Sequence, residues 1–112
     1  MVLFITGQCP RSCWYCPLSR ERRGFDRVYA NEKEITSPAG AVEVARMMAA
    51  RGTGVTGGEP LVVLQRVIEY CRKLKEAFGD SYHIHLYTGT APGESDLYAL
   101  RGYVDEIRLH PP

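Results

Sequence analysis

The sequence predicts an α/β domain with parallel strands, because short β-branched runs alternate along the chain with longer amphipathic segments of helical period. Strands that alternate with helices in this way pair in parallel through right-handed crossovers. A closed eightfold barrel uses about 31 residues for each strand–helix unit, so the 112 residues make roughly 3.6 units. We therefore expect a parallel-stranded partial (β/α) barrel with about four strands, in one domain spanning residues 1–112.

The first strand is expected at residues 2–6, where the chain is apolar and β-branched. No further strand or helix is expected before Ser37 and Pro38, which are typical of a helix N-cap and a first helical residue. This helix should run to residue 51, because Gly52 stands where a glycine commonly ends a helix.

The second strand, at residues 53–56, runs directly into the sequence Gly57-Gly58-Glu59-Pro60. The double glycine permits positive φ and a close approach of the backbone, and Pro60 fixes the entry to the next helix. The N-terminus of that helix is a natural place for the carboxylate of a ligand. The remaining elements are a helix at residues 61–78, a strand at 82–88, a helix at 94–101 and a strand at 104–110.

Composition and charge exclude several classes of protein. The 14 Lys and Arg residues nearly balance the 13 Asp and Glu residues, so the net charge of +1 does not favour nucleic acid or an anionic membrane. With 45% hydrophobic and 24% charged residues, the composition is that of a folded domain. No apolar run approaches the roughly 20 residues that span a bilayer, and the first residues lack the basic start of a secretory signal. We expect a cytoplasmic protein with no membrane partner.

Three of the four cysteines, Cys9, Cys13 and Cys16, lie within eight residues, and Cys71 lies far from them. A secreted disulfide framework would normally spread an even set of cysteines along the chain. Thiolates a few residues apart are typical of iron–sulfur clusters. A 4Fe-4S cluster needs four ligands, so three local cysteines leave one iron open, as in a catalytic metal site.

Zinc is the alternative occupant of the three-cysteine segment, because zinc takes four nitrogen or sulfur ligands. His83, His85 or Cys71 would have to complete such a site. Cys71 falls on the apolar stripe of the helix at residues 61–78, as expected of a buried structural thiol.

Two later strands are expected to present polar side chains on one face. Successive residues of a strand point to opposite sides, so His83, His85 and Tyr87 share a face, and so do Arg108 and His110. The apolar faces would pack under helices and the polar faces would line the interior of the barrel. Sites in such folds lie at the carboxyl ends of strands. The residues that fall at those ends are Cys9, Gly57, Thr88 and His110.

The two motifs together resemble those of the radical SAM superfamily. The cysteine segment reads CxxxCxxC with the aromatic residue Tyr15 before the last cysteine, and it follows the first strand. The Gly-Gly-Glu-Pro sequence follows the second strand, which is where that family places it. The resemblance covers the whole chain and is strongest with an archaeal-type group related to pyruvate formate-lyase activating enzymes. It implies that this chain is the N-terminal portion of a radical SAM core.

The resemblance also implies roles for particular residues. Cys9, Cys13 and Cys16 would bind three irons of a 4Fe-4S cluster, and S-adenosylmethionine (SAM) would chelate the fourth iron through its amino and carboxylate groups. The backbone of Tyr15 would contact the adenine. The residues implied to lie against the methionine amino group are Gly57, Gly58 and Glu59.

Three more residues are implied at the ends of later strands. Thr88 occupies the place of a Thr-Asn-Gly turn in many members, although this sequence has Tyr87-Thr88-Gly89 and lacks the Asn. Arg108 and His110 fall where many members offer polar side chains to the cofactor or the substrate.

The activity that the resemblance implies is reductive cleavage of SAM. A reductant protein such as flavodoxin or ferredoxin would supply an electron to the cluster, and a 5′-deoxyadenosyl radical would then abstract hydrogen from a substrate that the sequence does not name. The alternative is a non-enzymatic iron–sulfur protein used for electron transfer or redox sensing. A third possibility is that this portion is inert without the later strands, because the family's core has about six strand–helix units.

Overall fold

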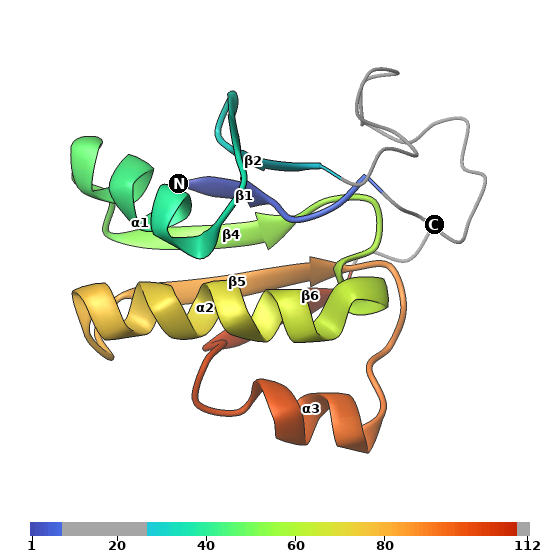
Figure 1. The fold of residues 1–112 in the computed structure, drawn as a ribbon. Helices are drawn as coiled ribbons and strands as arrows, with labels where there is room; N and C mark the ends of the chain where they lie inside the picture. The colour runs from blue at the N-terminus through green and yellow to red at the C-terminus, as the bar shows by residue number, and fades with distance from the viewer. Residues whose placement is uncertain (8–26, 110–112) are drawn as a thin grey trace.

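The computed structural model describes residues 1–7 and 27–109. In this part of the chain one six-stranded sheet has the order β3-β2-β1-β4-β5-β6. Its parallel strands are β1 (Val2–Phe4), β4 (Gly52–Thr56), β5 (His83–Thr88) and β6 (Glu106–Leu109). The arrows of β4 and β5 point the same way in Figure 1. The predicted α/β fold with mostly parallel strands is confirmed, and the arrangement is consistent with a partial barrel.

Two strands that the sequence analysis did not anticipate extend the sheet at one edge. β2 (Val28–Ala30) pairs antiparallel with β1, and β3 (Lys33–Ile35) pairs antiparallel with β2. Asn31 turns the chain between them with φ 54, a left-handed conformation that Asn tolerates. Its side-chain oxygen accepts a hydrogen bond from the amide of Val2 at 3.0 Å, which ties the turn to β1. Strands of three residues show too little period-two alternation to be recognised in the sequence.

Helix α1 (Pro38–Met47) begins as predicted but ends four residues before the expected residue 51. The Ser37 hydroxyl accepts a hydrogen bond from the third helical amide at 3.4 Å, as expected of an N-cap. At the other end Ala49, with φ 51, takes the left-handed position that the sequence analysis assigned to Gly52. Backbone hydrogen bonds of the Schellman type close this end, and Gly52 instead begins β4.

The predicted helix at residues 61–78 consists of a short 3₁₀-helix, η1 (Pro60–Val63), followed by α2 (Leu64–Phe78). α2 packs against α1 and also contacts α3 (Glu94–Leu100), so the three helices form one layer over the sheet (Figure 1). The core lies between this layer and the strands. Its fully buried side chains include Leu3, Ile5, Val55, Val67, Cys71, Leu74, Ile84 and Leu86.

The opposite side of β5 and β6 carries the side chains of His83, His85, Tyr87, Glu106 and Arg108. We call it the helix-free face, because no helix in the described part of the chain covers it (Figure 1). Burial alternates along β5, where Ile84, Leu86 and Thr88 are buried and His83, His85 and Tyr87 are exposed or half-buried. The predicted division of β5 into an apolar and a polar side is therefore confirmed. Leu109, expected under a helix, is half exposed at the end of β6. Among the described residues, no helix is long and apolar enough to cross a membrane.

Candidate functional site

The carboxyl ends of β1 and β4 are joined by backbone hydrogen bonds. The amide of Ile5 donates to the carbonyl of Thr56 at 2.9 Å, and the amide of Gly58 donates to the carbonyl of Thr6 at 2.8 Å. The guanidinium of Arg66, on α2, donates to the carbonyl of Ile5 at 3.3 Å. The chain that leaves β1 toward the cysteine segment is thus attached to the Gly-Gly-Glu-Pro turn. The predicted site residues Cys9, Cys13, Tyr15, Cys16 and His110 lie outside the described residues.

Gly57 allows this close approach. Its φ is +152, in the region that favours glycine. A Cβ at this position would lie 2.5 Å from the carbonyl oxygen of Thr6 and 3.2 Å from its nitrogen. The predicted positive φ is confirmed, and the backbone that approaches Gly57 is that of Thr6.

The carboxylate of Glu59 links the turn after β4 to the turn after β5. Oε1 accepts hydrogen bonds from the amide of Gly89 at 2.8 Å and from the hydroxyl of Thr90 at 3.1 Å. Oε2 accepts from the hydroxyl of Thr88 at 2.8 Å and from the amide of Leu61 at 3.0 Å. Glu59 is only 5% exposed, so these four donors replace water around a buried carboxylate.

The contact with Leu61 changes one expectation. The first turn after Pro60 was expected to receive the carboxylate of a ligand, but Glu59 is itself the N-cap and its own carboxylate occupies the Leu61 amide. The amide of Leu61 is therefore already hydrogen-bonded within the protein.

Thr88 has a buried hydroxyl with several neighbours. It lies 2.8 Å from Glu59 Oε2 and 3.0 Å from the carbonyl of Thr90, and it accepts a hydrogen bond from the amide of Thr90 at 3.1 Å. A hydroxyl has one proton, and an ionised carboxylate is a stronger acceptor than a carbonyl, so we assign the Thr88 hydroxyl as the donor to Glu59 rather than to the carbonyl of Thr90. The structure therefore brings together two predicted site residues, Glu59 and Thr88, and adds Thr90. Thr90 was not predicted as a site residue, because no sequence motif marks it.

Arg108 lies in a different group, on the helix-free face. Its Nε donates to Glu106 Oε1 at 3.0 Å, and its Nη1 donates to the hydroxyl of Tyr87 at 2.9 Å. The hydrogen bond to Glu106 is the main cause that raises the pKa of Arg108. Arg108 and Thr88 are thus not in one cluster, because the paired residue of Arg108 across the strands is Tyr87.

The histidines of β5 lie over glycines of β4. His83 pairs with Gly52 and His85 with Gly54, and a Cβ on Gly54 would come within 2.7 Å of His85 Nε2. The ring centroids of His85 and Tyr87 are 5.1 Å apart in an edge-to-face arrangement. Burial, followed by the positive charge of Arg108, lowers the pKa of His85. His85 Nδ1 has no hydrogen-bond partner in the described part of the chain.

The described residues contain no group of three His, Cys, Asp or Glu side chains arranged to hold a metal ion. Cys71 is fully buried in the core, and burial raises its pKa to about 12. The expectation that Cys71 is a buried structural thiol is confirmed, and its thiolate is not available to complete a zinc site.

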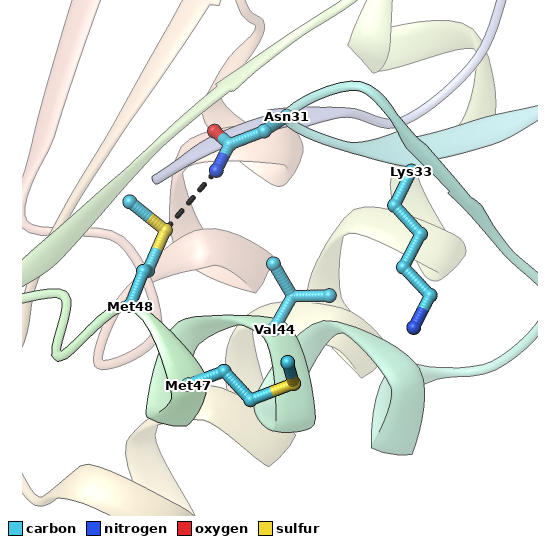
Figure 2. A pocket seen from close by; sticks show the side chains of 5 residues that line it. All are labelled: Asn31, Lys33, Val44, Met47 and Met48. Atoms are coloured by element: carbon cyan, nitrogen blue, oxygen red, sulfur yellow. Dashed lines mark hydrogen bonds between the residues drawn. The ribbon is translucent and has the colours of Figure 1, made fainter.

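A depression of about 300 Å³ lies at the other end of the sheet, between the β2–β3 turn and the end of α1 (Figure 2). The side chains that line it are Asn31, Lys33, Val44, Met47 and Met48. The amide nitrogen of Asn31 donates to the Met48 sulfur at 3.1 Å across it. Because Asn31 is bonded to the amino end of β1, this depression is not part of the site at the carboxyl ends.

Comparison with known proteins agrees with these observations. The family described as "4Fe-4S single cluster domain" matches residues 1–106, so the chain belongs to this family of radical SAM-type iron–sulfur domains, whose description implies a 4Fe-4S cluster.

Among curated proteins, the chain is 45% identical over 113 aligned residues to one from Methanocaldococcus jannaschii named "Putative glycyl-radical enzyme activating enzyme". The alignment covers 99% of this chain and 30% of the relative, so the chain spans less than a third of that protein's length. No solved structure matches the chain.

Proposed function

We propose that the chain is the cofactor-binding part of a radical SAM enzyme. In this proposal Cys9, Cys13 and Cys16 hold a 4Fe-4S cluster and SAM binds its fourth iron. The observation that carries the proposal is the hydrogen bond from the Gly58 amide to the Thr6 carbonyl, at 2.8 Å, which joins the Gly-Gly-Glu-Pro turn to the end of β1. Thr6 stands three residues before Cys9 in the sequence, so this contact supports a shared site for the two motifs.

The residues that are present suit this group chemically. Three thiolates at CxxxCxxC spacing are a donor set for iron and leave one position open. When bound, the cluster and SAM would supply one-electron cleavage of a carbon–sulfur bond and a 5′-deoxyadenosyl radical that abstracts hydrogen. The protein's part is to place these groups and to keep competing reactions out.

The chain's own residues would do this through backbone and rigid turns. Gly58 has no side chain, so an amino group can approach its peptide unit closely, whereas the space that a side chain of Gly57 would take is filled by the backbone of Thr6. Glu59 and Thr88 hydrogen-bond each other, and their backbones border the place where the carboxyl ends of β4 and β5 meet. We assign the adenine contact to the backbone of Tyr15.

The helix-free face supports a role in substrate contact. Arg108 and Tyr87 form a hydrogen-bonded pair there, beside His85. His110 lies outside the described residues, and only the alternation of the sequence predicts it on the same side as Arg108. We assign Arg108 and His110 to the cofactor or the substrate on this basis. The name of the archaeal relative supports a glycyl-radical enzyme as the substrate class. We also propose flavodoxin or ferredoxin as the reductant and a cytoplasmic setting, as the resemblance of the sequence implies.

The experiment that tests the proposal uses the full chain after anaerobic reconstitution with iron and sulfide. Reduction with dithionite in the presence of SAM should release 5′-deoxyadenosine, detected by mass spectrometry, and SAM should change the electron paramagnetic resonance (EPR) spectrum of the reduced cluster. A spectrum that ignores SAM would favour the alternative of an electron-transfer or redox-sensing protein. A spectrum that responds without 5′-deoxyadenosine would mean that this chain binds the cofactor but does not catalyse alone.

A further inference from the structure

The most completely satisfied polar side chain near the proposed site is that of Glu59. Each of its carboxylate oxygens accepts two hydrogen bonds, from the donors Leu61, Thr88, Gly89 and Thr90, at distances between 2.8 and 3.1 Å. A carboxylate offers about four acceptor positions, so the set is full. The amino group of a ligand could reach these oxygens only by displacing one of the protein donors.

The four donors come from two turns that follow different strands. Leu61 lies in η1, directly after the Gly57-Gly58 turn that follows β4, whereas Thr88, Gly89 and Thr90 end β5 and begin the next connection. Gly58 is in turn bonded to Thr6 after β1. Hydrogen bonds to a buried ionised acceptor are stronger than those between neutral groups, so Glu59 fixes the turns of β4 and β5 to each other.

We propose that Glu59 is a positioning residue: its carboxylate clamps the Thr88–Thr90 turn to the Gly57-Gly58 turn, and it does not contact the cofactor. The clamp keeps the peptide units of both turns in one arrangement. The two turns therefore lose less conformational entropy when a ligand binds. The part of this inference that concerns SAM rests on the proposed function, whereas the clamp itself stands on the hydrogen bonds.

Thr90 gives the cleanest test, because its hydroxyl donates to Glu59 Oε1 and the residue has no assigned contact with the cofactor. Thr90→Val keeps the shape and removes the donor, and Thr90→Ser restores it. Glu59→Gln removes the negative charge and replaces one acceptor oxygen by an NH₂ group, which cannot accept the hydrogen bonds that this oxygen received. The matched control is Thr53→Val, which removes a buried hydrogen bond of 2.6 Å to Tyr82 at the opposite end of the sheet.

All variants are prepared as the full chain, and SAM is titrated while the EPR spectrum of the reduced cluster is followed. We expect Thr90→Val and Glu59→Gln to weaken SAM binding by roughly threefold to tenfold, the effect of one to a few lost hydrogen bonds, with unchanged iron content. Thr90→Ser should bind SAM as the wild type does. Thr53→Val should lower the melting temperature without changing SAM affinity. Unchanged affinity in both Thr90→Val and Glu59→Gln would overturn the positioning role.

Amide hydrogen exchange measures how firmly the two turns are held and needs no cofactor. It therefore separates failure of the clamp from failure of the proposed function. Thr90→Val should accelerate exchange at both the Gly58 and the Gly89 amides, because the two turns loosen together. Acceleration confined to Gly89 would overturn the clamp. If SAM does not change the EPR spectrum of the wild-type cluster, but Thr90→Val accelerates exchange at both the Gly58 and the Gly89 amides, the proposed function is refuted and the clamp is supported.

Discussion

The ammonium group of Lys75, on α2, donates to Oδ2 of Asp105 at 2.7 Å and closes the end of the sheet opposite the candidate site. Lys75 also donates to the carbonyls of Tyr82 at 2.7 Å and Asp80 at 3.1 Å. The same Asp105 oxygen accepts the amide of Ile84 at 2.8 Å. One lysine thus fastens the helix to the beginnings of β5 and β6, and it is 9% exposed.

Replacing Lys75 should destabilise the protein. Lys75→Met keeps the aliphatic stem but leaves three acceptors without their donor, so we expect a loss of about 1–3 kcal/mol in the free energy of unfolding. Urea unfolding measures this loss. Lys73→Met, on the same helix, is the control, because Lys73 pairs with Glu76 at the surface and its replacement should change stability by less than about 0.5 kcal/mol. Equal effects would contradict the assigned role.

The contribution of this pair should depend on pH. Burial would raise the pKa of Asp105, but the hydrogen bonds from Lys75 and Ile84 and the charge of Lys75 outweigh it and lower that pKa. A carboxyl with a lowered pKa stabilises the fold above its unfolded pKa of about 3.9, and the contribution is lost as the pH falls through the folded value. The stability difference between wild type and Lys75→Met should therefore shrink below about pH 4. A constant difference across the acid range would count against this account.

The three clustered cysteines and Cys71 should respond differently to substitution. Alanine at Cys9, Cys13 or Cys16 should abolish cluster binding, measured as iron and acid-labile sulfide after anaerobic reconstitution. Cys71→Ala should retain iron, because this thiol is buried in the core and its raised pKa of about 12 keeps it protonated. Loss of iron from Cys71→Ala alone would require a different ligand set.

Gly57→Ala should cost more stability than positive φ alone explains. The added Cβ would lie 2.5 Å from the carbonyl oxygen of Thr6, and backbone atoms cannot move aside cheaply. Gly79→Ala is the matched control, because Gly79 has φ +89 and nothing within 4 Å of the added atom. We expect about 1–2 kcal/mol for Gly79→Ala from strain and a larger loss for Gly57→Ala, compared by urea unfolding. Similar losses of unfolding free energy in the two variants would show that the backbone of Thr6 moves away from the added Cβ at little cost.

His85 should titrate below the usual histidine pKa of about 6.5. Burial and the charge of Arg108 both lower its pKa, so Arg108→Gln should raise it toward the ordinary value. Because the folded pKa is lowered, the neutral form favours folding, and stability should fall as the pH drops below about 6.5. Histidine chemical shifts in an NMR titration measure both values. A pKa that Arg108→Gln leaves unchanged would contradict the electrostatic coupling.

Local patterns in the sequence predicted the parallel strands well. The alternation of histidine and aliphatic residues in β5 identified both its faces, and Ser37-Pro38 located the start of α1. The pattern failed where the backbone conformation was unusual for the residue. Ala49 ends α1 in a left-handed conformation usually adopted by glycine, so the expected end at Gly52 was wrong.

The candidate site was predicted only in part, because its contacts are distant in sequence. The Gly-Gly-Glu-Pro motif located the turn after β4, and the positive φ of Gly57 agrees with the expectation. The partners of the Glu59 carboxylate after β5 stand 29–31 residues further along the chain, and no local signal identifies them. The three cysteine assignments stay predictions.

The glycines of β4 differ in how freely they could be replaced. An added methyl group at Gly54 would meet the tip of the His85 ring, which can swing away, whereas at Gly52 it would meet the carbonyl oxygen of His83 at 2.6 Å. A small side chain on the surface of β4 beneath the histidine rings is therefore tolerated at Gly54 but not at Gly52. We expect substitutions that change the shape of this surface to be accepted at Gly54 in engineered and natural variants.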